Sequence, residues 1–422
     1  MPQRVLAAGM ALLRRDDTVN WALIDQALIS GVNFLTTILV ARFLGVEEFG
    51  RFALAWFIVL FAASIHASLI VWPMMSLGPK HGDDETPGYF GAVAVQHLLY
   101  SAVTLPVLLL AVWAMAHLVP AWRLDGLALP IACAALLVQT QDTLRRYFFT
   151  RERGLAAFVN DAVRYLGQLA VLTWLLITVP MDAAGALWVI AATAAAAVLA
   201  GLLRRADLRL DRAAVTAALA RHWRFGKWLT ASAVVAGLAG NTVSFATGAM
   251  LGAAAIGAVH SAYAILGVTH IVHFGLTNVA LVRAAALYHD GGGAAMTPFL
   301  WRIAWWMLGG TAAIALVAVA APEFWLGLLL GAAYAPYGYL LVWWAAIVLI
   351  EAVVLPLESG LRAMEATRPA FLAELWRLLA AAILLYPLIR WFGMTGVMLC
   401  FLALAVVRTG VLAAALRRRL RE

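Results

Sequence analysis

The feature that most constrains this chain is a series of apolar runs, each about 20 residues long, that recurs along the whole sequence. A helix of that length crosses the roughly 30 Å hydrocarbon core of a bilayer. The runs are rich in Leu and Ala and lack the two-residue alternation of transmembrane β-strands. They predict an all-α integral membrane protein with about twelve transmembrane helices. The predicted spans are residues 19–41, 52–73, 90–118, 127–149, 158–179, 184–203, 226–250, 257–282, 299–321, 337–357, 371–390 and 393–416.

The distribution of basic residues predicts the topology of these spans. Only 12% of the residues are charged, yet the net charge is +8. If the N-terminus lies in the cytoplasm, the cytoplasmic segments hold 24 of the 30 Lys and Arg residues. Because Lys and Arg accumulate in cytoplasmic loops, we expect both termini inside and no nucleic-acid partner. The six remaining basic residues are Arg42, Arg51, Arg123 and Arg390 in external loops and Arg164 and Arg408 inside spans; basic residues at the cytoplasmic ends of spans are counted with the cytoplasmic segments.

Neither the N-terminal segment nor the cysteines suggest processing or a cofactor. Residues 1–18 carry three arginines around a short apolar piece, and the first span follows at once without a convincing cleavage site. We therefore expect an interfacial segment and not a cleaved signal peptide. Cys133 and Cys400 both fall within predicted spans, so we expect no disulfide framework, no metal site and no cofactor.

One short motif interrupts the apolar pattern twice. The stretches FLGVEEFGRFALAW at 43–56 and MLGAAAIGAVHSAY at 250–263 align at an offset of 207 residues. Since glycine accepts the positive φ of a tight helix end, each copy predicts a short external hairpin. The matches are Leu44 with Leu251, Gly45 with Gly252, Gly50 with Gly257, Phe49 with Ile256, Trp56 with Tyr263 and, upstream, Trp21 with Trp228.

The repeat predicts two halves of six spans each. An even number of spans keeps both halves in the same orientation, as in transporters built from two parallel bundles. We expect an N-terminal lobe at 1–203, a linker at 204–225 and a C-terminal lobe at 226–422 around a central cavity. The linker is basic, and Asp211 is placed to cap a short amphipathic helix, whose apolar residues, such as Val215, would lie on the inner membrane surface.

Two stretches resemble a known family. DQALISGVNFLTTILVARFLGVEEFGRFALAW and HWRFGKWL look like the first span, first hairpin and mid-chain entry of bacterial polysaccharide transporters. That family includes flippases for lipid-linked O-antigen and exopolysaccharide units, within the multidrug/oligosaccharidyl-lipid/polysaccharide exporter superfamily. The resemblance covers the whole chain in span count and two-lobe layout, but its specific residues cluster near spans 1, 2 and 7.

The resemblance implies the function of a flippase in the bacterial inner membrane. It implies a 6 + 6 helical fold, a central cavity and alternating access. The implied cargo is an undecaprenyl-diphosphate-linked oligosaccharide for lipopolysaccharide or exopolysaccharide biosynthesis. Its implied partners are the lipid bilayer, the lipid-linked oligosaccharide, and a glycan polymerase with other assembly proteins.

Polar residues gather on the spans that would line such a cavity, namely 1, 2, 4 and 5 of one lobe and 7, 8, 10 and 11 of the other. Because charge facing lipid is costly, this distribution favours a wet or protein-lined interior. Span 1 carries a polar stripe at helical spacing, and span 7 repeats the spacing with smaller residues; cavity lining and close helix packing both explain the stripes. The stripes are Gln26, Ser30, Asn33 and Thr37 on span 1 and Gly237, Asn241, Ser244 and Gly248 on span 7.

Three arginines are candidates to bind an anionic diphosphate. Arg164 lies inside span 5 with Asp161 three residues before it, so it either contacts cargo or forms a local ion pair. Arg51 lies at the external mouth of span 2 beside two glutamates, where solvated charge is the simpler role. Arg408 lies deep within span 12, which we expect to face away from the cavity.

The acids and histidines leave the driving ion open. Asp25 and Glu351 each lie near the cytoplasmic end of a span, where a carboxylate is either protonated or paired, and both states suit proton or cation coupling. His270 and His273 share one face of span 8, where they relay protons or simply pack. Span 7 lacks the acidic residue found in sodium-coupled lipid II flippases.

Two other functions compete with a flippase. A membrane glycan-assembly enzyme needs a catalytic loop, but the external loops are short, the sequence has no phosphate-binding or metal motif, and we expect no enzyme activity. A cation-coupled multidrug exporter of the same superfamily would have a site dominated by buried acids, whereas these spans carry both signs of charge.

Overall fold

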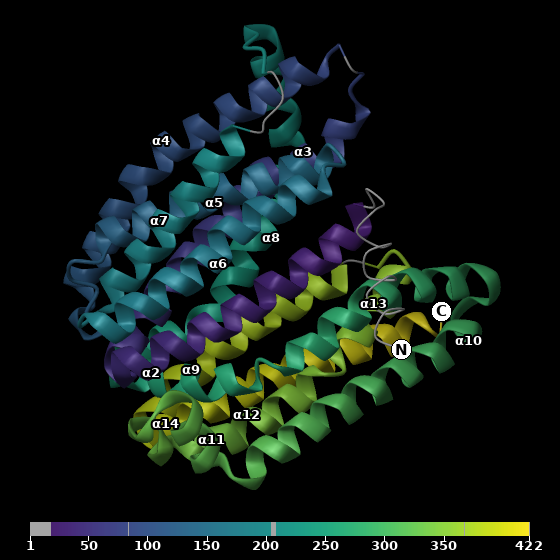
Figure 1. Cartoon of the computed structure of the whole chain (residues 1–422). Coiled ribbons are helices and arrows are strands. Elements are labelled where there is room, and N and C mark those ends of the chain that lie inside the picture. The colour runs from purple at the N-terminus through teal and green to yellow at the C-terminus, as the bar shows by residue number, and fades with distance from the viewer. Residues whose placement is uncertain (1–17, 83, 204–207, 367, 422) are drawn as a thin grey trace, which may run out of the picture. The chain divides into compact units, whose positions relative to one another are not determined.

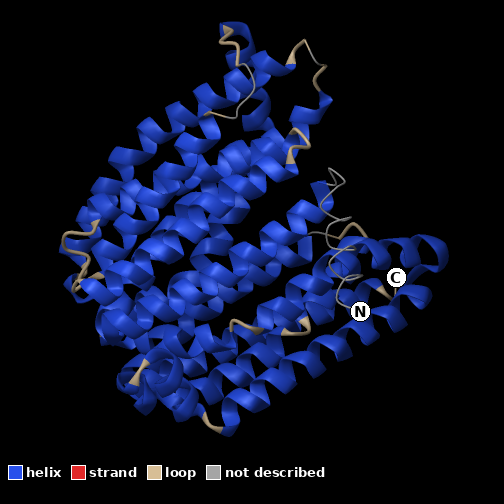
Figure 2. Ribbon diagram, in the orientation of Figure 1, coloured by secondary structure: helices blue, strands red, loops and turns tan. Residues whose placement is uncertain are grey.

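The computed structural model describes residues 18–82, 84–203, 208–366 and 368–421, except for the side chains of 18–19, 270–279 and 282. Within these residues every regular element is a helix (Figure 2). In chain order the elements are α2 (Thr18–His66), η1 (Ala67–Val71), α3 (Trp72–Leu77), η2 (Gly78–Lys80), α4 (Thr86–Leu118), η3 (Pro120–Trp122), α5 (Ala128–Thr150), α6 (Gly154–Thr178), α7 (Ala183–Leu202), α8 (Arg212–Leu251), α9 (Ala253–Leu266), α10 (Thr269–Ala320), α11 (Pro322–Leu330), η4 (Ala332–Tyr337), α12 (Gly338–Glu351), α13 (Val354–Ala363) and α14 (Arg368–Arg419).

The helices confirm a multi-pass membrane protein. In the described part, seven helical stretches are long and apolar enough to cross a membrane. They are 20–80, 86–118, 183–202, 212–251, 283–320, 332–363 and 368–419. Three of the long helices contain non-helical glycines, at Gly45 in α2, at Gly291 and Gly292 in α10, and at Gly393 in α14. Each of these three helices joins two predicted spans, so the count of twelve remains a prediction.

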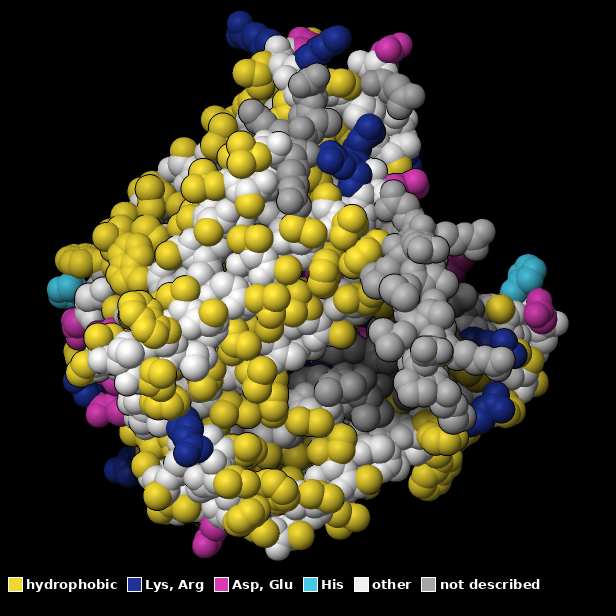
Figure 3. All heavy atoms as spheres, in the orientation of Figure 1, with side chains coloured by type: hydrophobic (Ala, Val, Ile, Leu, Met, Phe, Trp, Pro, Cys, Tyr) yellow, Lys and Arg dark blue, Asp and Glu magenta, His cyan; other side chains and the backbone are white. Residues whose placement is uncertain are grey.

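The chain divides into two compact units, each with its own core. Unit 1 comprises residues 1–39, 55–120 and 124–234, and in it α5 packs against α4, α6 and α7 (Figure 1). Unit 2 comprises residues 40–54, 121–123 and 235–422, and in it α13 packs against α10 and α14 while α12 packs against α9. Figure 3 shows apolar side chains covering much of the visible surface of unit 1, as expected for helices that face lipid.

The two copies of the hairpin motif confirm the predicted role of one glycine in each copy. Gly45 has φ 79° and ψ 173°, and its repeat partner Gly252 has φ 89° and ψ 172°. Only glycine adopts this region without strain. The other pair, Gly50 and Gly257, has a different role: an added methyl at Gly50 would collide with the carbonyl of Ala253, and one at Gly257 with the carbonyl of Val46. These two glycines allow close backbone approach within unit 2.

A second repeat, at an offset of 213 residues, appears in the α5–α6 and α13–α14 connections. Glu152 and Glu365 occupy the same place in the two turns and have φ 55° and 57°. Three backbone hydrogen bonds close the first turn: the N–H groups of residues 151, 152 and 153 donate to the carbonyls of 147, 149 and 148, respectively. In the second turn the N–H groups of 364, 365 and 366 donate to the carbonyls of 360, 362 and 361, which are the equivalent positions. The sequences that follow, AFVNDAVRYL at 157–166 and AFLAELWRLL at 370–379, align at the same offset. The alignment at 207 residues did not detect this repeat.

Part of the described linker packs on protein. Asp211 accepts hydrogen bonds from the backbone N–H groups of Ala213 and Ala214, which confirms the predicted cap. From Arg212 onward α8 is continuous into span 7. Val215 joins the apolar core of unit 1 around Tyr89, so this part of the expected membrane-facing surface is covered by protein.

The close backbone contact at Gly50 and Gly257 is expected to contribute to the stability of the protein. Gly50→Ala and Gly257→Ala place a methyl against backbone that cannot move locally, so each is expected to lower the detergent-solubilised thermal midpoint by several degrees, the effect of about 1–3 kcal/mol. Gly31→Ala in α2 is the matched control, since no atom lies within 4 Å of its added methyl. Thermal unfolding of the purified protein measures all three; an unchanged midpoint for both hairpin variants contradicts the close-contact role.

Candidate functional site

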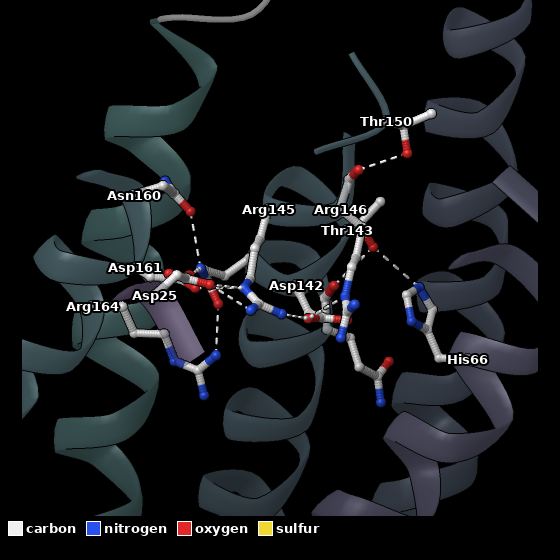
Figure 4. Close-up of polar contacts among 12 residues, drawn as sticks. Asp25, His66, Asp142, Thr143, Arg145, Arg146, Thr150, Asn160, Asp161 and Arg164 are labelled. Atoms are coloured by element: carbon white, nitrogen blue, oxygen red, sulfur yellow. Dashed lines mark hydrogen bonds and ion pairs between the residues drawn. The ribbon is translucent and has the colours of Figure 1, made fainter. Parts of the chain in front are cut away.

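A buried ion cluster joins three helices of unit 1 (Figure 4). Arg145 of α5 donates from Nη2 to Oδ2 of Asp25 on α2 at 2.5 Å, and its Nε lies 2.5 Å from Oδ2 of Asp161 on α6. Both aspartate side chains are 0% exposed. A third carboxylate, Asp142, lies 3.7 Å from Nη1 of the same guanidinium. Since a buried carboxylate is stable only when it is paired or protonated, Arg145 is the residue on which this cluster depends.

Of the two roles left open for Arg164, the local ion pair with Asp161 is not found among the described residues. Arg145 binds Asp161 instead, and Nη1 of Arg164 donates to Oε1 of Gln141 at 2.6 Å. Nε2 of Gln141 in turn donates to Oδ1 of Asp161 at 2.5 Å and to Oδ1 of Asn160 at 2.9 Å. The amide of Gln141 thus lies between the acid and the guanidinium. Spacing along α6 placed Arg164 near Asp161, but it gave no information about Arg145 on the neighbouring helix.

Arg164 is buried without a carboxylate within ion-pair distance among the described residues. It is 5% exposed. Its guanidinium lies 4.5 Å from the ring centroid of Tyr165, and its Nε has no hydrogen-bond partner. A buried guanidinium without a carboxylate partner keeps N–H groups that can donate hydrogen bonds to a phosphate or another oxyanion.

A second polar cluster in unit 1 joins His66 and His97. The Thr140 hydroxyl donates to the carbonyl of Leu136 at 2.7 Å, so it accepts from Nε2 of His97 at 2.8 Å. Nδ1 of a neutral His97 is then an acceptor, and Nε2 of His66 donates to it at 2.9 Å. His97 is therefore held by a hydrogen-bond chain that includes α4 and α5. All of these hydrogen bonds form when both imidazoles are neutral.

Unit 2 carries an ion cluster at positions related to those of unit 1 by the second repeat. The offset of 213 residues aligns Arg145 with Glu358, Asp161 with Glu374 and Arg164 with Arg377. The sign of the first pair is reversed, and Arg408 supplies the missing cation: its Nη2 lies 3.0 Å from Oε1 of Glu358 and its Nε 3.1 Å from Oε1 of Glu374.

Arg408, on the predicted span 12, turns its side chain toward the two glutamates and is 25% exposed. That span 12 faces away from the cavity stays a prediction. The remaining ion pairs of the cluster are Arg377 with Glu374 at 3.3 Å and Arg362 with Glu358 at 2.8 Å. Since both acids already have cations, Arg408 is first an internal counter-ion of unit 2.

The candidates on α2 and at the first hairpin are not members of these clusters, except for Asp25. On α2, Gln26 and Asn33 are exposed and Ser30 is half-buried. Arg51 pairs with Glu48 at 2.6 Å and donates to the carbonyl of Arg123 at 2.7 Å, as a rim charge does.

In unit 2, Asn241 donates within its own helix to the carbonyl of Gly237 at 2.9 Å. Oγ of Ser244 lies 3.0 Å from Nε2 of His260. Glu351 is the last residue of α12, is half-buried, and interacts electrostatically with Arg408 and Arg377 of the unit 2 cluster. The side chains of His270 and His273 lie outside the described residues. In the part of the chain that the structure describes, no group of three or more His, Cys, Asp or Glu side chains is arranged to hold a metal ion.

Comparisons with known proteins place this geometry in context. The family model described as "Polysaccharide biosynthesis protein" matches residues 18–282. No curated protein matches significantly. An inward-facing multidrug resistance MATE transporter of the MOP superfamily has a TM-score of 0.75 at 13% identity, covering 92% of this chain and 94% of its own. The inward closed lipid II flippase MurJ has a TM-score of 0.74 at 11% identity, covering 94% and 87%.

A third solved structure has the same fold. A MOP superfamily transporter from Pyrococcus furiosus has a TM-score of 0.62 at 13% identity, with 97% of each chain covered. At these identities the likenesses show the fold alone. They confirm the expected all-helical, two-lobe fold class.

Replacing Arg145 tests the charge pairing in unit 1. Arg145→Met leaves two buried carboxylates without their cation, so it is expected to destabilise the protein by about 3–5 kcal/mol. Adding Asp25→Asn and Asp161→Asn to the same chain removes the uncompensated charge and should restore most of the loss. The exposed Arg151→Met is the matched control. Thermal unfolding and membrane abundance measure the effect, and a triple variant no better than Arg145→Met would contradict the charge-pairing account.

Proposed function

The chain belongs to the polysaccharide biosynthesis protein family, and from that premise we propose that it is a flippase for undecaprenyl-diphosphate-linked oligosaccharides. It would move these units across the bacterial inner membrane by alternating access, for lipopolysaccharide or exopolysaccharide biosynthesis. The proposal includes cytoplasmic termini, lobes at 1–203 and 226–422 joined by the linker at 204–225, and a glycan polymerase and other assembly proteins as partners.

The observation that carries the proposal is the state of Arg164. The side chain is buried and hydrogen-bonds a neutral amide, not a carboxylate. A diphosphate entering a low-dielectric interior needs matched positive charge and directed donors, and a guanidinium supplies both. Asp161 does not compete for Arg164 directly, because Arg145 holds that acid.

Transport fits the chain better than catalysis. The family model concerns polysaccharide biosynthesis, and the solved structures of the same fold are a multidrug transporter and a lipid II flippase. The residues that stand out are ion pairs and hydrogen-bonded amides inside helix bundles. A transporter uses such groups to bind cargo and to stabilise alternative states, with no nucleophile or metal required.

The alternative is a cation-coupled multidrug exporter, and flippases and drug exporters share this fold. The MATE transporter and MurJ match almost equally, at TM-scores of 0.75 and 0.74. Charge favours the flippase. A site for cationic drugs needs acids in excess, whereas the three acids of the unit 1 cluster pair with Arg145 and Arg146. The buried Arg164, which binds a neutral amide, adds a third positive charge.

The loss of this protein tests the cargo class. A deletion strain is expected to lose a surface polysaccharide and to accumulate lipid-linked units on the inner leaflet, because synthesis continues while flipping stops. Radiolabelled sugar in the lipid fraction, probed for access to an external glycosidase, measures the accumulation. Normal export combined with new sensitivity to cationic dyes would favour the drug exporter.

Arg164 is tested by flipping in proteoliposomes at equal protein abundance. Arg164→Ala is expected to slow flipping at least about tenfold, since it removes charge-assisted bonds to phosphate. Arg164→Lys should recover part of the rate, because it keeps the charge and loses the bidentate geometry.

The matched control for Arg164 is Gln141→Leu. If Arg164 serves only to orient Gln141, this variant should slow flipping as much as Arg164→Ala, and the double variant should be no slower. That result would contradict the cargo role.

A further inference from the structure

The first half of α2 has one buried face that fixes its orientation. Asp25, Val32 and Thr36 are 0%, 4% and 6% exposed. Asp25 is bound by Arg145, and Oγ1 of Thr36 accepts a hydrogen bond from Nε2 of Gln168 on α6 at 3.0 Å. Residues at this spacing share one side of a helix. The two polar contacts therefore hold α2 against rotation about its axis.

The two remaining faces of α2 are exposed and differ in chemistry. Ile24 and Leu35 are 41% and 45% exposed. Leu35 follows Gln26 by roughly two and a half helical turns, so these two side chains point in opposite directions. The apolar face suits lipid. The opposite face carries Gln26, Ser30, Asn33 and Thr37, with the exposed Leu23 at its N-terminal end. Exposing its polar groups to hydrocarbon would leave them unsatisfied, which favours a polar surrounding for this face.

The polar face is rich in free hydrogen-bonding capacity and carries no charge. Nε2 of Gln26 donates to Oγ of Ser30 at 3.2 Å, and Oγ1 of Thr37 donates to the backbone carbonyl of Asn33 at 2.8 Å. The carbonyl of the Gln26 side chain, the hydroxyl hydrogen of Ser30 and the whole amide of Asn33 have no hydrogen bond to other described residues. These donors and acceptors extend over about 16 Å of helix.

We infer that this face of α2, formed by Gln26, Ser30, Asn33 and Thr37, binds the uncharged, hydroxyl-rich sugar portion of the cargo. The inference rests on the proposed function and adds the part of the cargo that this face recognises. Sugar hydroxyls both donate and accept, as amides and hydroxyls do. A diphosphate would find no cation on this face, and a cationic drug would find no acid.

The two recognition elements lie on helices that pack together. Gln168, one turn after Arg164 on α6, contacts Thr36 of α2. Arg164 is thus on the helix that supports the buried side of α2, while the sugar-binding face is turned away from that contact. A lipid-linked oligosaccharide presents a diphosphate directly joined to sugars, which requires a charged site and an uncharged site in one unit.

The test separates the sugar from the diphosphate. Equilibrium binding is measured on the purified full-length protein in nanodiscs with two probes. One is the lipid-linked oligosaccharide extracted from a strain of the same organism that lacks this protein, and the other is bare undecaprenyl diphosphate. The variant is Gln26→Leu/Asn33→Leu, the conservative variant is Gln26→Asn/Asn33→Gln, and the matched control on the opposite face is Ile24→Ala/Leu35→Ala.

The wild type is expected to bind the oligosaccharide lipid about tenfold more tightly than the bare lipid, the effect of one or two net hydrogen bonds. The double leucine variant should lose this advantage while its affinity for the bare lipid stays the same. The conservative and control variants should keep the advantage. A double leucine variant that retains it, or that loses affinity for both lipids equally, overturns the inference.

The failure of the proposed function has a different signature. If the wild type binds neither lipid, or if Arg164→Ala binds both as well as the wild type does, the flippase proposal or its diphosphate site fails first. If the wild type binds both lipids with equal affinity, the diphosphate site survives and the sugar-binding face alone is overturned.

Discussion

One guanidinium positions the core of unit 1. Arg145 lies between Asp25 and Asp161, both fully buried, and so joins α2, α5 and α6. In a protein surrounded by hydrocarbon, neither acid can find water as an alternative partner, so separating them from Arg145 would leave charge in a medium that does not solvate it. The orientation of α2 about its axis follows from this contact. Because Asp25 is turned inward, the polar stripe about a quarter-turn around the helix is turned outward.

The two copies of the second repeat have the same turn conformation but carry different charges. The turns at Glu152 and Glu365 share the same φ and the same hydrogen bonds, whereas Arg145 corresponds to Glu358. A reversed charge at one position requires a new counter-ion, and Arg408 provides it.

The sequence predicted what depends on local chemistry and missed what depends on contacts between helices. Apolar length predicted the membrane helices, and glycine chemistry predicted the conformation of Gly45 and Gly252. Arg145 was missed as a site residue because it lies near the end of its span, where topology alone explains an arginine. The sequence could not decide between the two roles of Arg164, because spacing within α6 does not show that α5 presents Arg145 to Asp161. The second repeat was missed because its offset differs by six residues from that of the first hairpin.

Fold likeness to both a drug transporter and a lipid II flippase means that the cargo has to be argued from side chains, since one scaffold supports many functions. Two features of unit 1 bear on it together. The buried Arg164, bound to a neutral amide, is suited to an oxyanion, and the open stripe on α2 is suited to hydroxyl groups and carries no charge. A compact cationic drug uses neither feature. A prenyl diphosphate without sugars uses only the first, and a free glycan only the second. A lipid-linked oligosaccharide uses both, and for that reason we favour it over the other cargo classes of this fold.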